Sequence, residues 1–158
     1  MNAFRAKPLK FPWPPLLYGA AVLIALALGH LFPIPVAHEH SWILSLVGYG
    51  LVVLAITIDL WAVKTLLDRH TAVLPNRCAT CLVTCGPFRF TRNPIYFSYT
   101  LAMTGLGLAT INPWFFITAI AAVGLTTLFA IRKEERHLLS RFGFEFERYC
   151  RHTRAGCI

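Results

Sequence analysis

The stretch WILSLVGYGLVVLAITIDLWAV, Trp42–Val63, decides the fold, because it is predominantly apolar and contains a single charged residue, Asp59. A helix needs about 20 such residues to cross the hydrocarbon core of a bilayer. The chain has 158 residues, of which 56% are hydrophobic and only 14% charged. That leaves too little polar surface for a soluble domain of this size. The stretch therefore predicts a membrane-spanning helix, and the chain an integral membrane protein.

Other apolar stretches lie on both sides of this one. We expect four transmembrane helices, at about residues 15–32, 42–63, 94–111 and 113–131. Asn112 alone separates the last two, so they are expected to form a tight helical hairpin. The prediction is an all-α integral membrane protein with one domain across residues 1–158.

The basic residues predict how the spans are oriented. All 15 lysines and arginines precede the first span, lie between the second and third, or follow the fourth. The positive-inside rule assigns such segments to the cytoplasm. Both termini and residues 64–93 are therefore expected there. The net charge of +8 then faces anionic lipid headgroups, so no nucleic-acid partner is expected.

Three of the five cysteines form the pattern Cys78-x-x-Cys81-x-x-x-Cys85 in the expected cytoplasmic segment. A structural zinc site normally takes four ligands in two clustered pairs, and this pattern has one ligand too few. Disulfides are not expected in a reducing compartment. We therefore predict no metal, with a cysteine-based metal or redox module kept as an alternative.

The segment Arg89–Tyr96, at the start of the third predicted span, is a candidate binding site. Asn93-Pro94 is a typical helix start, since Asn caps free backbone N–H groups and Pro suits the first helical position. Asn112-Pro113 begins the fourth span in the same way, but without charged neighbours. The helix N-terminus and two arginines favour a carboxylate or phosphate. On local physics alone, binding of lipid phosphates is an equally good interpretation.

Helical periodicity continues beyond the fourth span. At about 100° per residue, the apolar side chains form one stripe, which comprises Leu138, Leu139, Phe142, Phe146 and Tyr149. This pattern predicts an amphipathic helix on the cytoplasmic surface, which Gly143 can break. Glu135 falls in the middle of the stripe and Glu134 at its edge. Because an unpaired charge is costly to bury, Glu135 is expected to meet Tyr96, an arginine of Arg89–Arg92 or a ligand.

Two motifs then carry a family resemblance. TCLVTCGPFRFTRNPIY, Thr80–Tyr96, followed one hairpin later by RKEERHLLSRFGFEFERY, Arg132–Tyr149, resembles the isoprenylcysteine carboxyl methyltransferase family, including its bacterial members and the related phospholipid methyltransferases. The resemblance covers about residues 71–149. It implies a cofactor, S-adenosylmethionine, bound on the cytoplasmic side of a bacterial inner membrane. It also implies a lipophilic methyl acceptor that arrives from the bilayer.

The resemblance also implies roles for individual residues. Cofactor binding is expected from Thr80, Cys81, Leu82, Val83, Phe88, Asn93, Pro94, Ile95, Tyr96 and Glu134. Catalytic roles are expected for Glu135, Tyr96, Arg92 and Arg132. The start of the third span suits the cofactor carboxylate, the glutamates suit its hydroxyl and amino groups or sulfonium charge, and Phe88 suits its adenine.

The sequence departs from the family pattern at three positions, and the third leaves the acceptor open. Asn93 replaces the His of eukaryotic members, and Phe146 replaces a usual Tyr. Ala130 stands where eukaryotic members have a substrate-side arginine, with Arg132 nearby. The acceptor is therefore an isoprenylcysteine-like carboxylate, a lipid or a small hydrophobic molecule. The alternative activity is an NADPH-dependent membrane reductase of the sterol reductase type, which normally has many more spans.

Overall fold

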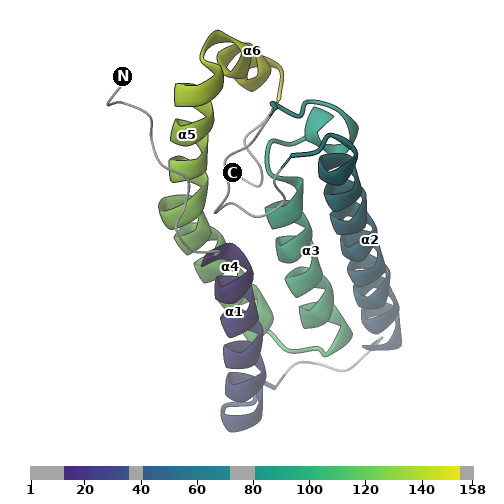
Figure 1. The fold of residues 1–158 in the computed structure, drawn as a ribbon. Coiled ribbons are helices and arrows are strands. Elements are labelled where there is room, and N and C mark those ends of the chain that lie inside the picture. Colours follow the sequence, from purple (N-terminus) through teal and green to yellow (C-terminus); the bar gives the residue numbers. More distant parts are fainter. Residues whose placement is uncertain (1–12, 36–40, 72–80, 154–158) are drawn as a thin grey trace.

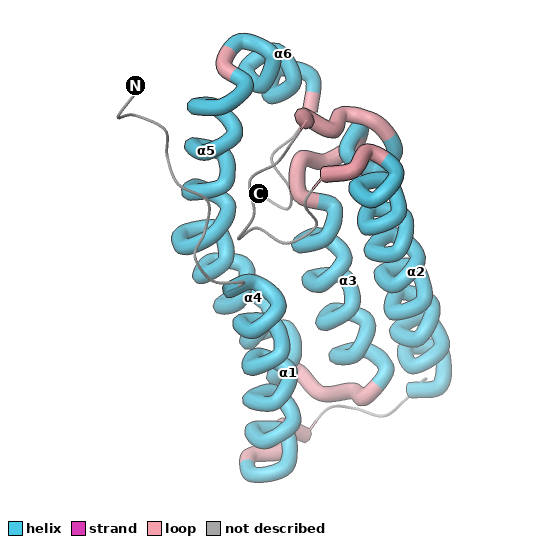
Figure 2. Tube along the Cα trace, in the orientation of Figure 1, coloured by secondary structure: helices cyan, strands magenta, loops and turns pink. Residues whose placement is uncertain are grey.

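The computed structural model describes residues 13–35, 41–71 and 81–153, which form a bundle of helices (Figure 1). Helix α1 (Trp13–Leu31) packs along α4 (Trp114–Thr126). Helix α2 (Ser41–Asp68) packs along α3 (Pro94–Ala109), which also contacts α4. Helices and the loops that join them account for these ranges, as Figure 2 shows. The predicted all-α class is confirmed.

Three helical segments within the described residues are long and apolar enough to cross a membrane: Pro14–Leu31, Trp42–Asp68 and Trp114–Phe142. Large apolar side chains such as Leu23 and Ile120 are exposed on them, as lipid-facing side chains are. The third predicted span is α3, which has only 16 residues. At 1.5 Å per residue it is about 24 Å long, short of the ~30 Å hydrocarbon core. A fourth span stays a prediction.

The helix that begins at Trp114 extends beyond residue 131, the predicted end of the fourth span, as the helical periodicity predicted. It continues through a π-helical turn, η2 (Thr127–Ile131), into α5 (Arg132–Phe142). No glycine or proline separates these elements, so nothing in the backbone ends the helix there. Gly143 does end it, with a φ of 51° that favours glycine. The predicted amphipathic helix is therefore divided into α5 and α6 (Phe144–His152).

Helices α2 and α3 approach each other at their backbones. A Cβ atom on Gly48 would lie 2.4 Å from the Ala109 nitrogen, and one on Gly105 would lie 2.7 Å from the Gly48 oxygen. Small residues at such crossings allow close packing of membrane helices. Ser45 Oγ adds a hydrogen bond to the Ala109 carbonyl at 3.2 Å. This contact sets the position of α3 against α2, and with it the start of α3.

The segment before α3 folds back onto α2. It contains a 3₁₀ turn, η1 (Gly86–Arg89), which contacts α2. Gly86 has a φ of 61°, and a Cβ atom there would lie 2.7 Å from Thr65 Oγ1. A side chain at this position would therefore be strained and crowded. Glycine lets the turn lie against α2, which brings Phe88 to the end of the bundle.

Candidate functional site

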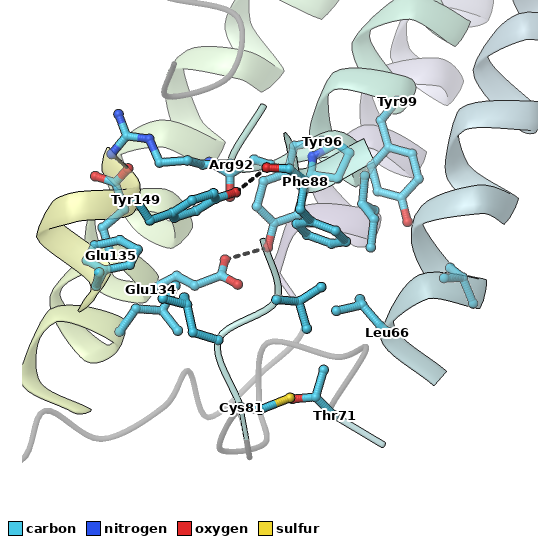
Figure 3. A pocket seen from close by; sticks show the side chains of 18 of the residues that line it. Leu66, Thr71, Cys81, Phe88, Arg92, Tyr96, Tyr99, Glu134, Glu135 and Tyr149 are labelled. Atoms are coloured by element: carbon cyan, nitrogen blue, oxygen red, sulfur yellow. Dashed lines mark hydrogen bonds and ion pairs between the residues drawn. The ribbon is translucent and has the colours of Figure 1, made fainter. Parts of the chain in front are cut away.

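A cavity of about 160 Å³ lies between the start of α3, the end of α2, and helices α5 and α6 (Figure 3). Every described member of the predicted cofactor-binding set lines it: Cys81, Leu82, Val83, Phe88, Asn93, Pro94, Ile95, Tyr96 and Glu134. Thr80 lies outside the described residues. Arg92 and Glu135, from the predicted catalytic set, line the same cavity. Two motifs that are distant in sequence thus meet around one space.

Two polar contacts cross this cavity from the start of α3 to α5. Tyr96 Oη donates a hydrogen bond to Oε2 of Glu134 at 3.0 Å. Arg92 Nη1 lies 2.8 Å from Oε1 of Glu135, with the two side chains 17% and 30% exposed. This second contact is ionic, because Oε1 is outside hydrogen-bonding geometry. The prediction that Glu135 meets an arginine of Arg89–Arg92 is confirmed. Tyr96, the other expected partner of Glu135, bonds Glu134 instead.

Helix α6 closes one side of the cavity through two contacts. Tyr149 Oη donates to the Phe88 carbonyl at 2.5 Å, and Arg92 Nη1 donates to Cys150 Sγ at 3.1 Å. Burial raises the pKa of the Tyr149 phenol to about 12. The phenol is therefore protonated at neutral pH and stays a donor. These contacts join α6 to the segment that precedes α3.

The two Asn-Pro helix starts differ, which corrects one expectation. Asn112 Oδ1 accepts a hydrogen bond from the Trp114 N–H at 3.1 Å, as a capping side chain does. Asn93 makes no such bond at the start of α3. Its Nδ2 is instead buried without a hydrogen-bond partner among the described residues, and so is Arg92 Nε. The prediction that the Asn93 side chain caps α3 is wrong, because that side chain lines the cavity.

These unpartnered donors indicate what the cavity can hold. A buried N–H group without a partner is costly, so such groups normally meet a protein or ligand acceptor. Two glutamates supply acceptors on the opposite wall, and Phe88, Leu138 and Phe146 supply apolar surface. The arrangement fits a ligand with a carboxylate, several hydroxyl or amino groups and an aromatic part.

Some lining residues were missed by the sequence reasoning. They are Pro15 of α1, Val63 and Leu66 near the end of α2, Thr71 just after α2, and Tyr99 of α3. Tyr99 follows Tyr96 by three residues and so shares its helix face, a signal that was available in the sequence. The residues of α1 and α2 carry no local signal, since only the packing of the helices places them at the cavity.

Arg132, one of the predicted catalytic residues, lies elsewhere. It is exposed, and it lines a second, more open groove together with Arg136 and Arg151. Arg92 and Glu135 line both spaces. Arg132 stands one helical turn before Glu135, outside the part of α5 that faces the first cavity.

The cysteine pattern is only partly described. Cys81 lines the cavity, and its Sγ donates a hydrogen bond to the Arg69 carbonyl at 3.4 Å. Cys78 lies outside the described residues. Within the described ranges, no group of three or more His, Cys, Asp or Glu side chains is arranged to hold a metal ion. The absence of metal stays a prediction.

Comparisons with known proteins add independent information. The family model for phospholipid methyltransferase matches residues 43–145. The nickel-cobalt-cadmium resistance protein NccN of Alcaligenes xylosoxydans xylosoxydans is 33% identical over 140 residues, which cover 86% of this chain and 59% of the relative. The cobalt-zinc-cadmium resistance protein CzcN of Cupriavidus metallidurans is 36% identical over 84 residues, or 52% of this chain and 38% of the relative. No solved structure matches this chain.

Proposed function

Because this chain belongs to the phospholipid methyltransferase family, we propose that it transfers a methyl group from S-adenosylmethionine to a lipophilic acceptor. The family match supports a membrane methyltransferase and does not favour the reductase alternative. The chain spans less than two thirds of both curated relatives, 59% and 38% of their lengths. The cofactor and the acceptor are therefore parts of this proposal.

One observation carries the proposal: the two predicted motifs converge on a single cavity. Tyr96 of the first motif bonds Glu134 of the second at 3.0 Å, and Arg92 pairs with Glu135 at 2.8 Å. A helical hairpin separates these motifs in the sequence, so local periodicity does not account for the contacts. A shared ligand does account for both the convergence and the unpartnered donors beside it.

The residues present fit S-adenosylmethionine. Asn93 Nδ2, Arg92 Nε and the free backbone N–H groups at the start of α3 suit its carboxylate. Glu134 and Glu135 suit its ribose hydroxyls, amino group or sulfonium charge. Phe88 offers a face for the adenine ring. Each polar part of the cofactor thus has a complementary group in the cavity wall.

When bound, S-adenosylmethionine would supply an electrophilic methyl group for the acceptor's lone pair, and the bond from that methyl carbon to sulfur would break, with the neutral thioether S-adenosylhomocysteine as the leaving group. The chain contributes positioning and exclusion of water, which α6 provides through the Tyr149 and Arg92 contacts. A carboxylate or thiolate acceptor needs no base. An amine or hydroxyl acceptor would lose a proton, and Glu135 is the candidate base, because the neutral Tyr96 phenol already donates its proton to Glu134.

A binding titration tests the proposal directly. S-adenosylhomocysteine, the product, is titrated into the detergent-solubilised protein by calorimetry. We expect saturable binding at one site, weakened at least tenfold by Glu134→Gln. Glu145→Gln is the matched control, because Glu145 is exposed on α6 and does not line the cavity. Absence of binding to the wild type would reject the cofactor assignment.

The names of the relatives support a second candidate role, in metal tolerance. Both are described as resistance proteins for cobalt and cadmium, among other metals. We propose that methyl transfer by this chain contributes to such tolerance. In a cobalt- and cadmium-sensitive strain, the wild-type chain should raise tolerance and Glu135→Gln should not. If the wild type and Glu135→Gln raised metal tolerance equally, tolerance would not depend on methyl transfer.

A further inference from the structure

An apolar groove runs between α1 and α3. Its volume is about 280 Å³, and its lining includes Pro15, Gly19 and Val22 of α1 and Tyr99, Met103 and Leu106 of α3. The two sets of residues each cover about two helical turns, so the groove extends for roughly 11 Å along the bundle. Apart from tyrosine hydroxyls, the named side chains offer no polar groups.

The groove adjoins the candidate cofactor cavity. Pro15 and Tyr99 line both spaces. Figure 3 shows Tyr99 next to Tyr96, on the side of the cavity away from Glu134 and Glu135. A ligand's hydrocarbon chain that lies in the groove would therefore reach the cavity at Tyr99, opposite the carboxylates of Glu134 and Glu135.

The floor of the groove is held by contacts between its two walls. Tyr18 Oη and Thr100 Oγ1 form a hydrogen bond of 2.7 Å between α1 and α3. The rings of Tyr18 and Tyr99 pack with their centroids 5.4 Å apart. Tyr18 and Met103 are buried, with exposed fractions of 6% and 2%. The groove is thus a formed part of the bundle with a buried base.

The pairing of these two spaces solves a physical problem of methyl transfer to a lipid. The reacting head of the acceptor has to enter a cavity that contains two glutamates and an arginine. If the hydrocarbon chain of the acceptor followed it into this cavity, it would desolvate these polar groups at a high cost in free energy. Lipid tails are as apolar as leucine side chains. A chain that moves from the bilayer into the groove therefore stays in apolar surroundings while its head reaches the polar cavity.

We propose that this groove holds the hydrocarbon chain of the methyl acceptor, with Tyr99 at the point where the chain meets the reacting head. The proposal rests on the proposed function and deepens it. The occupant is one hydrocarbon chain of a membrane-dissolved molecule, and Gly19 is a position that determines specificity, because it leaves the wall of the groove open.

Two glycines, Gly19 and Gly50, provide the positions for a test substitution and its control. A Cβ atom added at Gly19 would meet nothing within 4 Å, so a larger side chain can be introduced without a backbone clash. Gly50 on α2 is exposed and has the same free space, but it does not line the groove. Gly19→Trp fills the groove, whereas Gly50→Trp adds the same bulk elsewhere on the apolar surface.

The probe is palmitic acid with a photoreactive diazirine in its chain, in vesicles of phosphatidylethanolamine and phosphatidylglycerol that contain the full chain. After irradiation, the labelled peptides are mapped by mass spectrometry. We expect labelling of α1 and α3 at the groove that unlabelled palmitic acid competes away. It should persist in Gly50→Trp and fall at least tenfold in Gly19→Trp, with unchanged S-adenosylhomocysteine affinity in both.

Two outcomes would overturn the groove assignment. One is labelling of the wild type that cannot be competed and is spread over exposed faces such as that of Val53, as contact with bulk lipid would give. The other is undiminished groove labelling in Gly19→Trp. Absence of S-adenosylhomocysteine binding in the wild type, with competed groove labelling intact, would instead reject the proposed function and leave the groove as a lipid site. The wild-type map stands even if Gly19→Trp folds poorly.

Discussion

Arg92 Nη1 lies 2.8 Å from Oε1 of Glu135, so an ion pair joins the segment just before α3 to the first turn of α5. The same nitrogen donates to Cys150 Sγ on α6. Arg92 therefore connects three segments around the cavity. Removing Glu135 would leave a largely buried guanidinium without its carboxylate, which is more damaging than the loss of one contact.

Glu135→Gln is therefore expected to fold and remain in the membrane while losing methyl transfer by at least tenfold. Its amide keeps the shape of the side chain but not the charge that Arg92 faces. Activity on the native acceptor and S-adenosylhomocysteine affinity are the two measurements. Glu145→Gln serves as the exposed control. Full activity of Glu135→Gln would show that the ion pair is only structural.

Tyr96→Phe is expected to weaken S-adenosylhomocysteine binding roughly tenfold, because it removes the 3.0 Å hydrogen bond that orients Glu134. The ring itself stays, so packing in the cavity is unchanged. Tyr49→Phe is the control, since Tyr49 is 62% exposed on α2. Equal affinities in the two variants would mean that the Tyr96 hydroxyl does not organise the site.

The two asparagines before proline should separate stability from binding. Asn112→Ala removes a capping bond to Trp114 and a 3.1 Å bond to the Ala25 carbonyl. It should lower the free energy of unfolding by about 0.5–2 kcal/mol and leave product affinity unchanged. Asn93→Ala removes no capping bond, so it should retain stability and lose affinity. Thermal unfolding in detergent and calorimetry check the pair. The reverse pattern would contradict this assignment.

The raised pKa of Tyr149 predicts that the protein loses stability at high pH. Burial raises its pKa to about 12 in the folded protein, above the value of about 10 for an unfolded chain. The stabilising contribution of the protonated phenol is complete below about pH 10 and is lost as pH rises towards 12. Wild type should therefore unfold at a higher temperature than Tyr149→Phe at pH 8, and this difference should shrink above pH 10. A difference that is constant with pH would contradict the assignment.

Purified protein is expected to contain no stoichiometric zinc, cobalt or cadmium. The described residues offer no group of three suitable ligands, and Cys81 is directed to a backbone carbonyl. Elemental analysis of wild type and Cys85→Ser checks this. Stoichiometric metal that is lost in Cys85→Ser would establish a site that includes the cysteine pattern.

Much of the candidate site could be predicted from the sequence because its parts are local. The Arg92–Tyr96 segment begins a helix, and Glu135 stands out as a charge within an apolar stripe. The resemblance of two motifs to a methyltransferase family then pointed to residues that line one cavity. The sequence did not indicate which glutamate contacts Tyr96 and which contacts Arg92, because Glu134 and Glu135 are adjacent in the same helical turn.

The sequence by itself determined the apolar helices, since the length of an apolar run and its lack of charge are properties of neighbouring residues. Only the tertiary structure decided that Asn93 lines a cavity while Asn112 caps a helix, although both precede proline. It also decided that a π-helical turn joins the last apolar run to α5. These outcomes depend on which helices lie side by side. That arrangement follows from backbone contacts such as Gly48 with Gly105, which join residues far apart in the chain and leave no periodic pattern in the sequence.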